Sequence, residues 1–183
     1  MIPLPTDMRG DIAYKGIIEL PWTAGDSGMV MSADEMHRYL LWWVWDWSLP
    51  LWLFLMLNPS KATHQRTDPT VARQAERVRR HGGGGVMVGN AGALRETDRL
   101  VALKSEDIIG PDNQFWLSHA TPLADKIIVA HGPDACKFGG DRLIRRATAG
   151  YQLWALNITK AGHPGHPLYV GYDAPLLPFE YAP

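Results

Sequence analysis

The chain has little cysteine, little net charge and no uninterrupted apolar run long enough for a plain membrane helix. Cys136 is the single cysteine among 183 residues, so no internal disulfide can form, which predicts a reducing, cytoplasmic environment. Lys and Arg number 18 against 19 for Asp and Glu, so no global charge draws the chain to nucleic acid. The first 14 residues lack the apolar core of a signal peptide.

Several enzyme signatures are also missing. The sequence has no Gly-x-Ser-x-Gly nucleophile elbow, and the glycines at 82–85 lack the Gly-Lys-Ser/Thr of a phosphate-binding loop. It has no internal repeat and no linker, so we expect a single domain over residues 1–183. No cofactor, metal or protein partner is predicted.

The most apolar stretch, residues 39–57, does not suit a membrane span. Asp46 and Pro50 lie in its middle, where a charge is costly and proline breaks a helix. We therefore expect two strands, 38–47 and 51–57, and no membrane contact.

Beyond residue 50, apolar runs alternate with helical segments. Buried strands are predicted at 51–57, 86–88, 126–130 and 151–156, and helices at 68–81, 111–124 and 140–149. Alternation of this kind is typical of a parallel sheet covered on both faces. The predicted fold is a three-layer α/β/α domain with a four-stranded, mainly parallel sheet over residues 50–170.

Residues 12–47 are predicted to form an N-terminal antiparallel extension. It contains a strand at 14–22, a turn at 23–29 and a short helical turn from Ser32, whose Glu35 completes a capping box. The strand at 38–47 is expected to pair with the strand at 14–22.

Polar residues follow each of the four core strands. Ligands of open α/β sheets bind at the carboxyl ends of the strands, so these residues are the candidate site. Amides and imidazoles form hydrogen bonds while neutral, which suits the edge of a nucleobase better than a metal. The residues are Asn58-Pro59-Ser60, Gly89-Asn90-Ala91, His131-Gly132-Pro133, and Asn157 with Gly162–Leu168.

Each of these residues also has a purely structural interpretation. Asn58 and Asn90 are suited to cap local turns, Asp68 is first of all a helix N-cap, and His163 and His166 fit an exposed loop. The basic residues of the first and last helices are typical of solvated helix faces. Together they would also border a groove for a phosphate backbone. Those favoured for DNA contact are Arg66, Arg73 and Lys137.

The order of these motifs resembles the uracil-DNA glycosylase superfamily. The motifs are Leu57–Ser60, Val86–Ala91, Ile128–Gly139 and the loop His163–Leu168, and they span residues 50–170. The chain is also similar to a bacterial and phage family of unknown function. That family shares Met-Leu-Asn-Pro-Ser, Asp-Pro-Thr, Asn-x-x-Ala-Leu-Arg and Gly-His-Pro-x-His-Pro-Leu-Tyr, which stand here at 56–60, 68–70, 90–95 and 162–169.

The glycosylase resemblance implies a reaction on a base flipped out of DNA. Asn90 would read the base, with Ser60 and His131 completing its pocket. Asn58 would position water, and Asp68 is the candidate general base. His163 or His166 would stabilise the departing base or contact a phosphate. Leu168 and Tyr169 would fill the vacated stack.

Two departures from the superfamily pattern bear on the substrate. Asn58 replaces the aspartate of the best catalysts, which predicts weak activation of water. Ser60 replaces a bulky tyrosine that excludes 5-substituents, which predicts a 5-substituted pyrimidine as substrate.

Two other functions remain open. A non-catalytic nucleic-acid or nucleotide-binding module predicts that Asp68 points away from Asn58. A different nucleobase-processing enzyme, for example one acting on free nucleosides, predicts no continuous basic groove.

Overall fold

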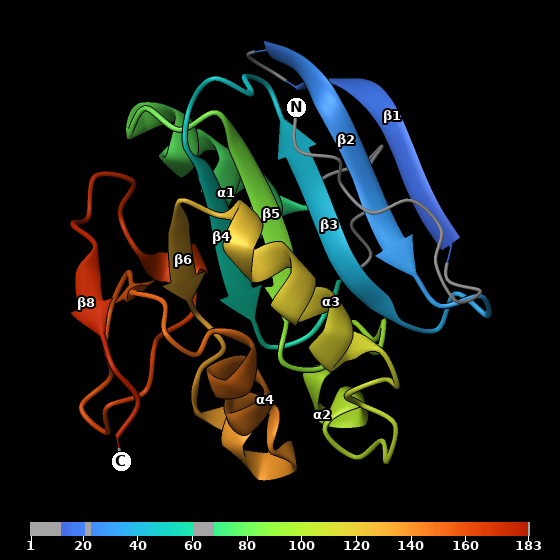
Figure 1. Cartoon of the computed structure of the whole chain (residues 1–183). Coiled ribbons are helices and arrows are strands. Elements are labelled where there is room, and N and C mark those ends of the chain that lie inside the picture. The colour runs from blue at the N-terminus through green and yellow to red at the C-terminus, as the bar shows by residue number, and fades with distance from the viewer. Residues whose placement is uncertain (1–11, 21–22, 61–67, 183) are drawn as a thin grey trace.

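The protein, described here by a computed structural model covering residues 12–20, 23–60 and 68–182, is built on one sheet (Figure 1). Within these residues the sheet has eight strands in the order β1-β2-β3-β5-β4-β6-β7-β8. The strands are β1 (Ile12–Leu20), β2 (Thr23–Met31), β3 (Arg38–Val44), β4 (Leu51–Met56), β5 (Gly85–Asn90), β6 (Lys126–Val129), β7 (Leu153–Ala155) and β8 (Leu177–Phe179).

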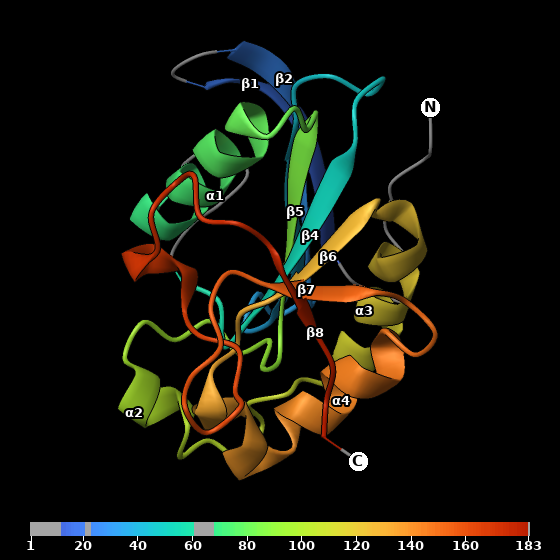
Figure 2. The same ribbon diagram turned by 90° about the vertical axis from the view of Figure 1, so that its left-hand side faces the viewer.

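Helices lie on both faces of this sheet, which gives the three layers visible edge-on in Figure 2. One face is covered by α1 (Pro69–Arg80), and the other by α3 (Asn113–Ala120) and α4 (Gly140–Ala147). The shorter helical segments are α2 (Arg99–Ala102) and the 3₁₀ turns η1 (Thr121–Leu123), η2 (Pro133–Phe138) and η3 (Pro167–Tyr169).

The apolar run of β4 explains its central position. All six of its residues are buried. Trp52, Phe54 and Met56 pack with the apolar residues of α1, whereas Leu53 and Leu55 pack on the opposite face with residues of α3 and α4. A strand that is apolar at every position is thus stable only between two helical layers, as the sequence indicated.

The parallel part of the sheet contains β5, β4, β6 and β7. The prediction of an α/β fold with an antiparallel N-terminal extension is confirmed, but the predicted four-stranded sheet is not, because the described residues form eight strands of one sheet. β3 pairs antiparallel with β5 through Leu41 and Val88, so the N-terminal strands continue the same sheet. The antiparallel β8 extends the other edge through Phe179, which pairs with Leu153.

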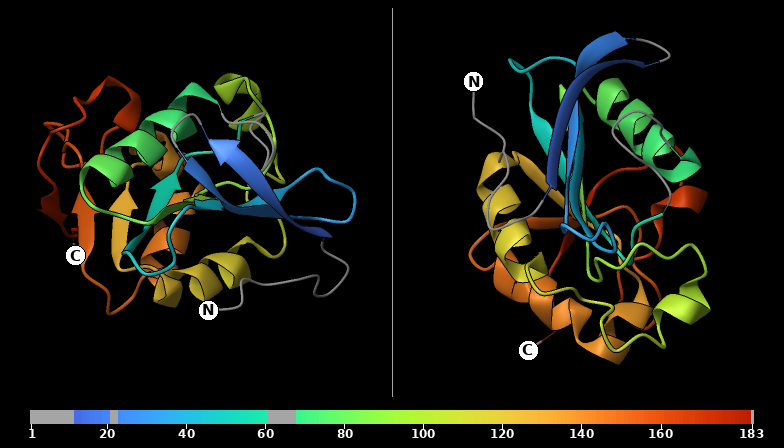
Figure 3. Two further views of the ribbon diagram at one scale, coloured as in Figure 1. Left: turned by 90° about the horizontal axis from the view of Figure 1, so that it is seen from above. Right: turned by 90° about the vertical axis from the view of Figure 1, so that its right-hand side faces the viewer.

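The N-terminal strands also differ in detail from the prediction. The segment expected as a turn at 23–29 belongs to β2, which lies between β1 and β3 and pairs with both, so β1 does not pair with β3 (Figure 3). Its glycines suggested a turn, but the ladders on both sides hold the segment extended. Ser32 starts a turn rather than a helix, and Glu35 takes a left-handed φ of 59° there.

The first crossover helix is confirmed. Asp68 caps α1 by accepting a hydrogen bond from the Val71 amide at 2.7 Å, and Pro69 occupies the first helical position. The strands predicted at 38–47 and 51–57 are confirmed as β3 and β4, although β3 ends earlier than predicted, at Val44. None of the helices in the described part of the chain is long and apolar enough to span a membrane.

Candidate functional site

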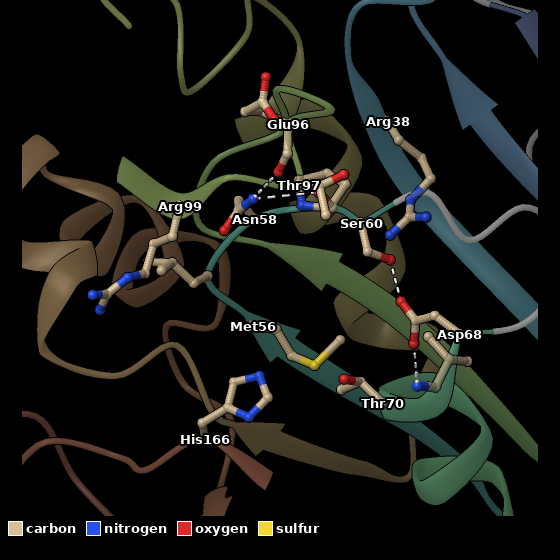
Figure 4. Close-up of a pocket in the computed structure, with 13 residues that line it drawn as sticks. Arg38, Met56, Asn58, Ser60, Asp68, Thr70, Glu96, Thr97, Arg99 and His166 are labelled. Carbon is tan, nitrogen blue, oxygen red and sulfur yellow. Dashed lines mark hydrogen bonds between the residues drawn. The ribbon is translucent and has the colours of Figure 1, made fainter. Parts of the chain in front are cut away.

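A cavity of about 230 Å³ lies at the carboxyl end of β4. Four segments that are far apart in the sequence form its wall (Figure 4). They are Arg38 at the start of β3, Met56–Ser60 after β4, the first turn of α1 with Asp68, and residues 96–99 after β5. His166 completes the wall from the loop before η3. This is the edge at which parallel α/β sheets bind their ligands.

Asn58 is held in one orientation by its amide nitrogen. Its Nδ2 donates to the carbonyl oxygens of Glu96 at 2.6 Å and of Pro59 at 3.3 Å. The amide oxygen Oδ1 receives no hydrogen bond from any residue that the structure describes. Asn58 therefore ties the 96–99 segment to the end of β4 and retains an acceptor for a ligand or a water molecule.

Asp68 is both a helix cap and a wall of the cavity. Its Oδ1 caps α1, while its Oδ2 accepts a hydrogen bond from the Ser60 hydroxyl. Ser60 itself lines the cavity, next to Asn58. The hydroxyl and the carboxylate thus form a connected polar pair within the cavity that also contains Asn58.

Arg38 is a residue of this site that the sequence did not reveal. The residue is only 1% exposed, although its side chain carries a guanidinium group. It lies beside an irregularity of the β2–β3 ladder, and its backbone amide donates to Ala93 O at 2.9 Å. Burial lowers the pKa of Arg38 to about 10, against the effect of the nearby Asp68 carboxylate, so the group stays charged at neutral pH.

His166 is neutral at neutral pH and presents an N–H group. Its Nδ1 accepts a hydrogen bond from the Leu168 amide at 3.3 Å, which places the ring proton on Nε2. Burial lowers the pKa of His166, and the Asp68 carboxylate offsets part of this effect. The ring can therefore donate a hydrogen bond without contributing charge.

Asn90 lies beside the cavity rather than in its wall. It pairs in register with Met56, so both side chains are on the α1 face of the sheet. The residue is 1% exposed, and neither Nδ2 nor Oδ1 of its amide has a hydrogen-bond partner among the residues that the structure describes. Its backbone carbonyl accepts from Asn113 Nδ2 at 3.0 Å. An unpaired buried amide is rare and calls for an explanation.

The other two predicted histidines lie outside the cavity wall, in a group that we call the β6-end cluster: His131, Cys136, His163 and Tyr181. Nδ1 of His131 donates to Gly132 O at 2.8 Å, and Nε2 accepts from the Tyr181 hydroxyl at 2.9 Å. The two rings are parallel. Burial lowers the pKa of His131, so this ring is also neutral.

The β6-end cluster does not resemble a nucleophilic centre. Nδ1 of His163 lies 4.0 Å from Cys136 Sγ. Partial burial and the Asp141 carboxylate raise the pKa of the Cys136 thiol, which keeps it protonated at neutral pH. The described residues contain no group of three His, Cys, Asp or Glu side chains that could hold a metal ion.

Most of the predicted DNA-binding residues contact their own chain. Arg73 donates to Val170 O at 3.0 Å and stacks on the Tyr172 ring. Lys137 pairs with Asp134 at 2.7 Å. Leu168 is half-buried in η3. Arg66 and the side chain of Tyr169 lie outside the described residues.

The 96–99 segment was also missed at the level of sequence. Glu96, Thr97 and Arg99 line the cavity, and the Arg99 guanidinium pairs with Asp134. They directly follow the Asn-x-x-Ala-Leu-Arg stretch at 90–95, which was the available signal. That stretch is brought to the cavity because Arg95 N donates to Met36 O and Leu94 N to Ile108 O.

Comparison with known families assigns the chain to a group without an assigned activity. The model of a protein family of unknown function, DUF1643, matches residues 38–168. The chain belongs to this family. The match covers more than two thirds of the chain and includes all the residues of the cavity wall. No curated protein and no solved structure matches the chain.

Proposed function

We propose that this DUF1643 protein is a DNA glycosylase that hydrolyses the N-glycosidic bond of a 5-substituted pyrimidine. The observation that carries the proposal is that Asn58, Ser60, Asp68 and His166 line one cavity. These residues come from separate motifs of the sequence. They bring together an acceptor for water, a carboxylate and a neutral N–H donor.

The size of the cavity supports a small ligand. Binding sites for drug-sized molecules occupy about 300–1,000 Å³. A cavity of about 230 Å³ suits one planar base rather than a whole nucleotide. A base within DNA would have to leave the stack to enter it, which is how enzymes that act on bases reach them.

The roles follow from the hydrogen bonds. Asn58 Oδ1 would orient a water molecule toward the sugar carbon, while Nδ2 keeps the amide in place. Asp68 would receive the proton of that water, with the Ser60 hydroxyl between them. The Nε2–H of His166 would donate to a carbonyl oxygen of the departing base. On the α1 face, the Asn90 amide has a donor and an acceptor that no described residue engages, as reading a base edge requires.

The fold and the small side chain at position 60 add further support. The four central parallel strands and the order of the motifs are those implied by the resemblance to the uracil-DNA glycosylase superfamily. Ser60 lines the cavity and is small, so it leaves space beside the base for a 5-substituent. Asp68 faces the same cavity as Asn58, which favours an enzyme over a binding module.

A second candidate, a hydrolase of free nucleosides, is favoured by the basic residues. Arg77 is fully buried and donates to Gly171 O at 2.6 Å, and Arg73 also holds the C-terminal loop. Side chains engaged in this way do not line a groove for a phosphate backbone.

Both candidates can be tested in one experiment. Labelled single- and double-stranded DNA with uracil, 5-hydroxymethyluracil or glucosylated 5-hydroxymethylcytosine is incubated with the protein and treated with alkali to cleave abasic sites. The corresponding nucleosides are assayed for free base in parallel. We expect cleavage of DNA with a 5-substituted base, lost in Asn58→Ala and Asn90→Ala. Gln114→Ala, an amide on α3 at the opposite face, is the control. Release of base from nucleosides alone would favour the second candidate.

A further inference from the structure

A second, larger space adjoins the cavity, and the roles above do not use it. This side pocket has a volume of about 600 Å³. Three of its wall residues, Ser60, Glu96 and Thr97, also line the cavity, so the two spaces meet there. Figure 4 shows these three residues on the side of the cavity opposite His166. The remaining wall residues are Glu35, Met36 and Arg95.

Hydrogen bonds between the turn after β2 and Arg95 hold the walls of the side pocket in place. Arg95 N donates to Met36 O at 2.9 Å, and Arg95 Nη1 donates to Glu35 O at 3.2 Å. Met36 N donates to Asp34 Oδ1 at 3.0 Å. The bonds of Met36 come from its backbone, whereas its side chain is 54% exposed. Sites for small ligands are usually pre-formed in this way.

The groups that line the side pocket favour a neutral ligand with many hydroxyls. The walls carry two carboxylates, Glu35 and Glu96, and one guanidinium, Arg95, so a phosphate would meet an excess of negative charge. Carboxylates accept hydrogen bonds from hydroxyls, Arg95 donates them, and the Thr97 hydroxyl does both. A volume of about 600 Å³ is within the range of sites for drug-sized molecules and leaves room for a sugar.

The shape of a pyrimidine connects the two spaces. C2 and C5 lie at opposite corners of the ring. A base whose O2 accepts the hydrogen bond of His166 Nε2–H therefore directs its 5-substituent toward the opposite wall. Ser60 and Thr97 lie on that side, where the cavity meets the side pocket.

We propose that the side pocket binds a sugar attached to the 5-hydroxymethyl group of the base. This inference names the substrate class of the cavity and rests on the function proposed above. Ser60 provides the passage between the two spaces. Glu96 and Thr97 border the first part of the sugar, and Glu35 and Arg95 border its far end.

Filling the side pocket tests the inference, because Met36 lines this space and not the cavity. Binding of 5-hydroxymethyl-2′-deoxycytidine and of its glucosylated form is measured by NMR titration, which does not depend on catalysis. The wild type should bind the glucosylated nucleoside at least about tenfold more tightly. Met36→Trp places an indole in the pocket and should weaken that binding at least about tenfold, with less than about a threefold change for the unglucosylated nucleoside.

Two matched variants are the controls. Met36→Leu leaves the side pocket open, and Leu49→Trp adds an indole at an exposed position before β4, at the other end of that strand. Both should bind the two nucleosides as the wild type does. Thermal unfolding checks that Met36→Trp folds, and the wild-type comparison decides the question if it does not.

Equal affinities of the wild type for the two nucleosides, or equal losses in Met36→Trp, would overturn the inference. Excision from DNA containing the same two bases is measured in parallel. Tighter binding of the glucosylated nucleoside without excision would refute the proposed glycosylase and support the sugar subsite. Excision of 5-hydroxymethylcytosine but not of its glucosylated form would support the glycosylase and overturn the subsite.

Discussion

The cavity and the β6-end cluster both lie at carboxyl ends of strands, and both contain residues that the sequence nominated for base recognition. In the β6-end cluster, both nitrogens of His131 are satisfied by Gly132 and Tyr181. In the cavity, Asn58 Oδ1 and His166 Nε2 lack partners among the described residues, and Arg38 carries a buried charge. The same residue types therefore stabilise the fold at one strand end and remain available to a ligand at the neighbouring one.

The comparison shows which property separates a functional group from a structural one. Position at a strand end is shared by both regions, as is a histidine whose pKa is lowered. The regions differ in whether other groups of the protein already form hydrogen bonds with the polar side-chain atoms.

The largest expected effect separates the two regions by activity. Asn58→Ala removes the acceptor for water and should slow base excision about 100-fold or more. His131→Phe preserves the stacked ring, removes only structural hydrogen bonds and should change the rate less than about threefold. Single-turnover cleavage measures both. A His131→Phe variant as slow as Asn58→Ala would show that the β6-end cluster takes part in the reaction.

The arginines of α1 provide the next contrast, in stability. Arg77→Met removes a fully buried guanidinium that donates to the carbonyls of Val170, Gly171 and Tyr172, and it should lower the free energy of unfolding by about 2–4 kcal/mol. Arg79 is exposed and pairs with Glu76, so Arg79→Met should cost less than about 0.5 kcal/mol. Urea unfolding distinguishes them, and equal costs would contradict the buried role of Arg77.

Asn58→Asp tests why the cavity has an amide at this position. A carboxylate would remove the donor to Glu96 O and place negative charge against that oxygen. We expect a loss of about 1–3 kcal/mol in unfolding free energy and no gain in excision rate. A faster and equally stable variant would mean that the contact between Asn58 and Glu96 is dispensable.

The smallest effect is a pH dependence of stability shared by both regions. Burial lowers the folded-state pKa of His131 and His166 below the ordinary value of 6.5. Below that pH the unfolded chain binds more protons than the folded one, so the free energy of unfolding should fall as the pH drops from 7.5 through 6.5 to 5.5. Replacing both residues, as His131→Phe with His166→Gln, should flatten this dependence in urea titrations. An unchanged slope would contradict the neutral state of the two rings.

The local signals in the sequence were sufficient for the core elements. The apolar run of β4 and the Asp68-Pro69 pair before α1 are local patterns of neighbouring residues. Each predicts its element directly from the sequence. β2 was missed because its extended form depends on two partner strands and overrides the local preference of its glycines. Arg38 was missed for a similar reason, since only the pairing of β3 with β5 brings it to the end of β4. The sequence predicted Asn58, Ser60, Asp68 and His166 as site residues. It could not show that His166, rather than His131 or His163, lines the cavity.

The most direct test of the account is the release of free base from DNA, detected by mass spectrometry with DNA containing 5-hydroxymethyluracil. We expect wild-type protein and His131→Phe to release the base and Asn58→Ala not to release it. Release by Asn58→Ala at the wild-type rate, or loss of release in His131→Phe alone, would contradict the assignment of the cavity as the reaction site. DNA binding without release by the wild type would contradict the proposed glycosylase and favour a binding module.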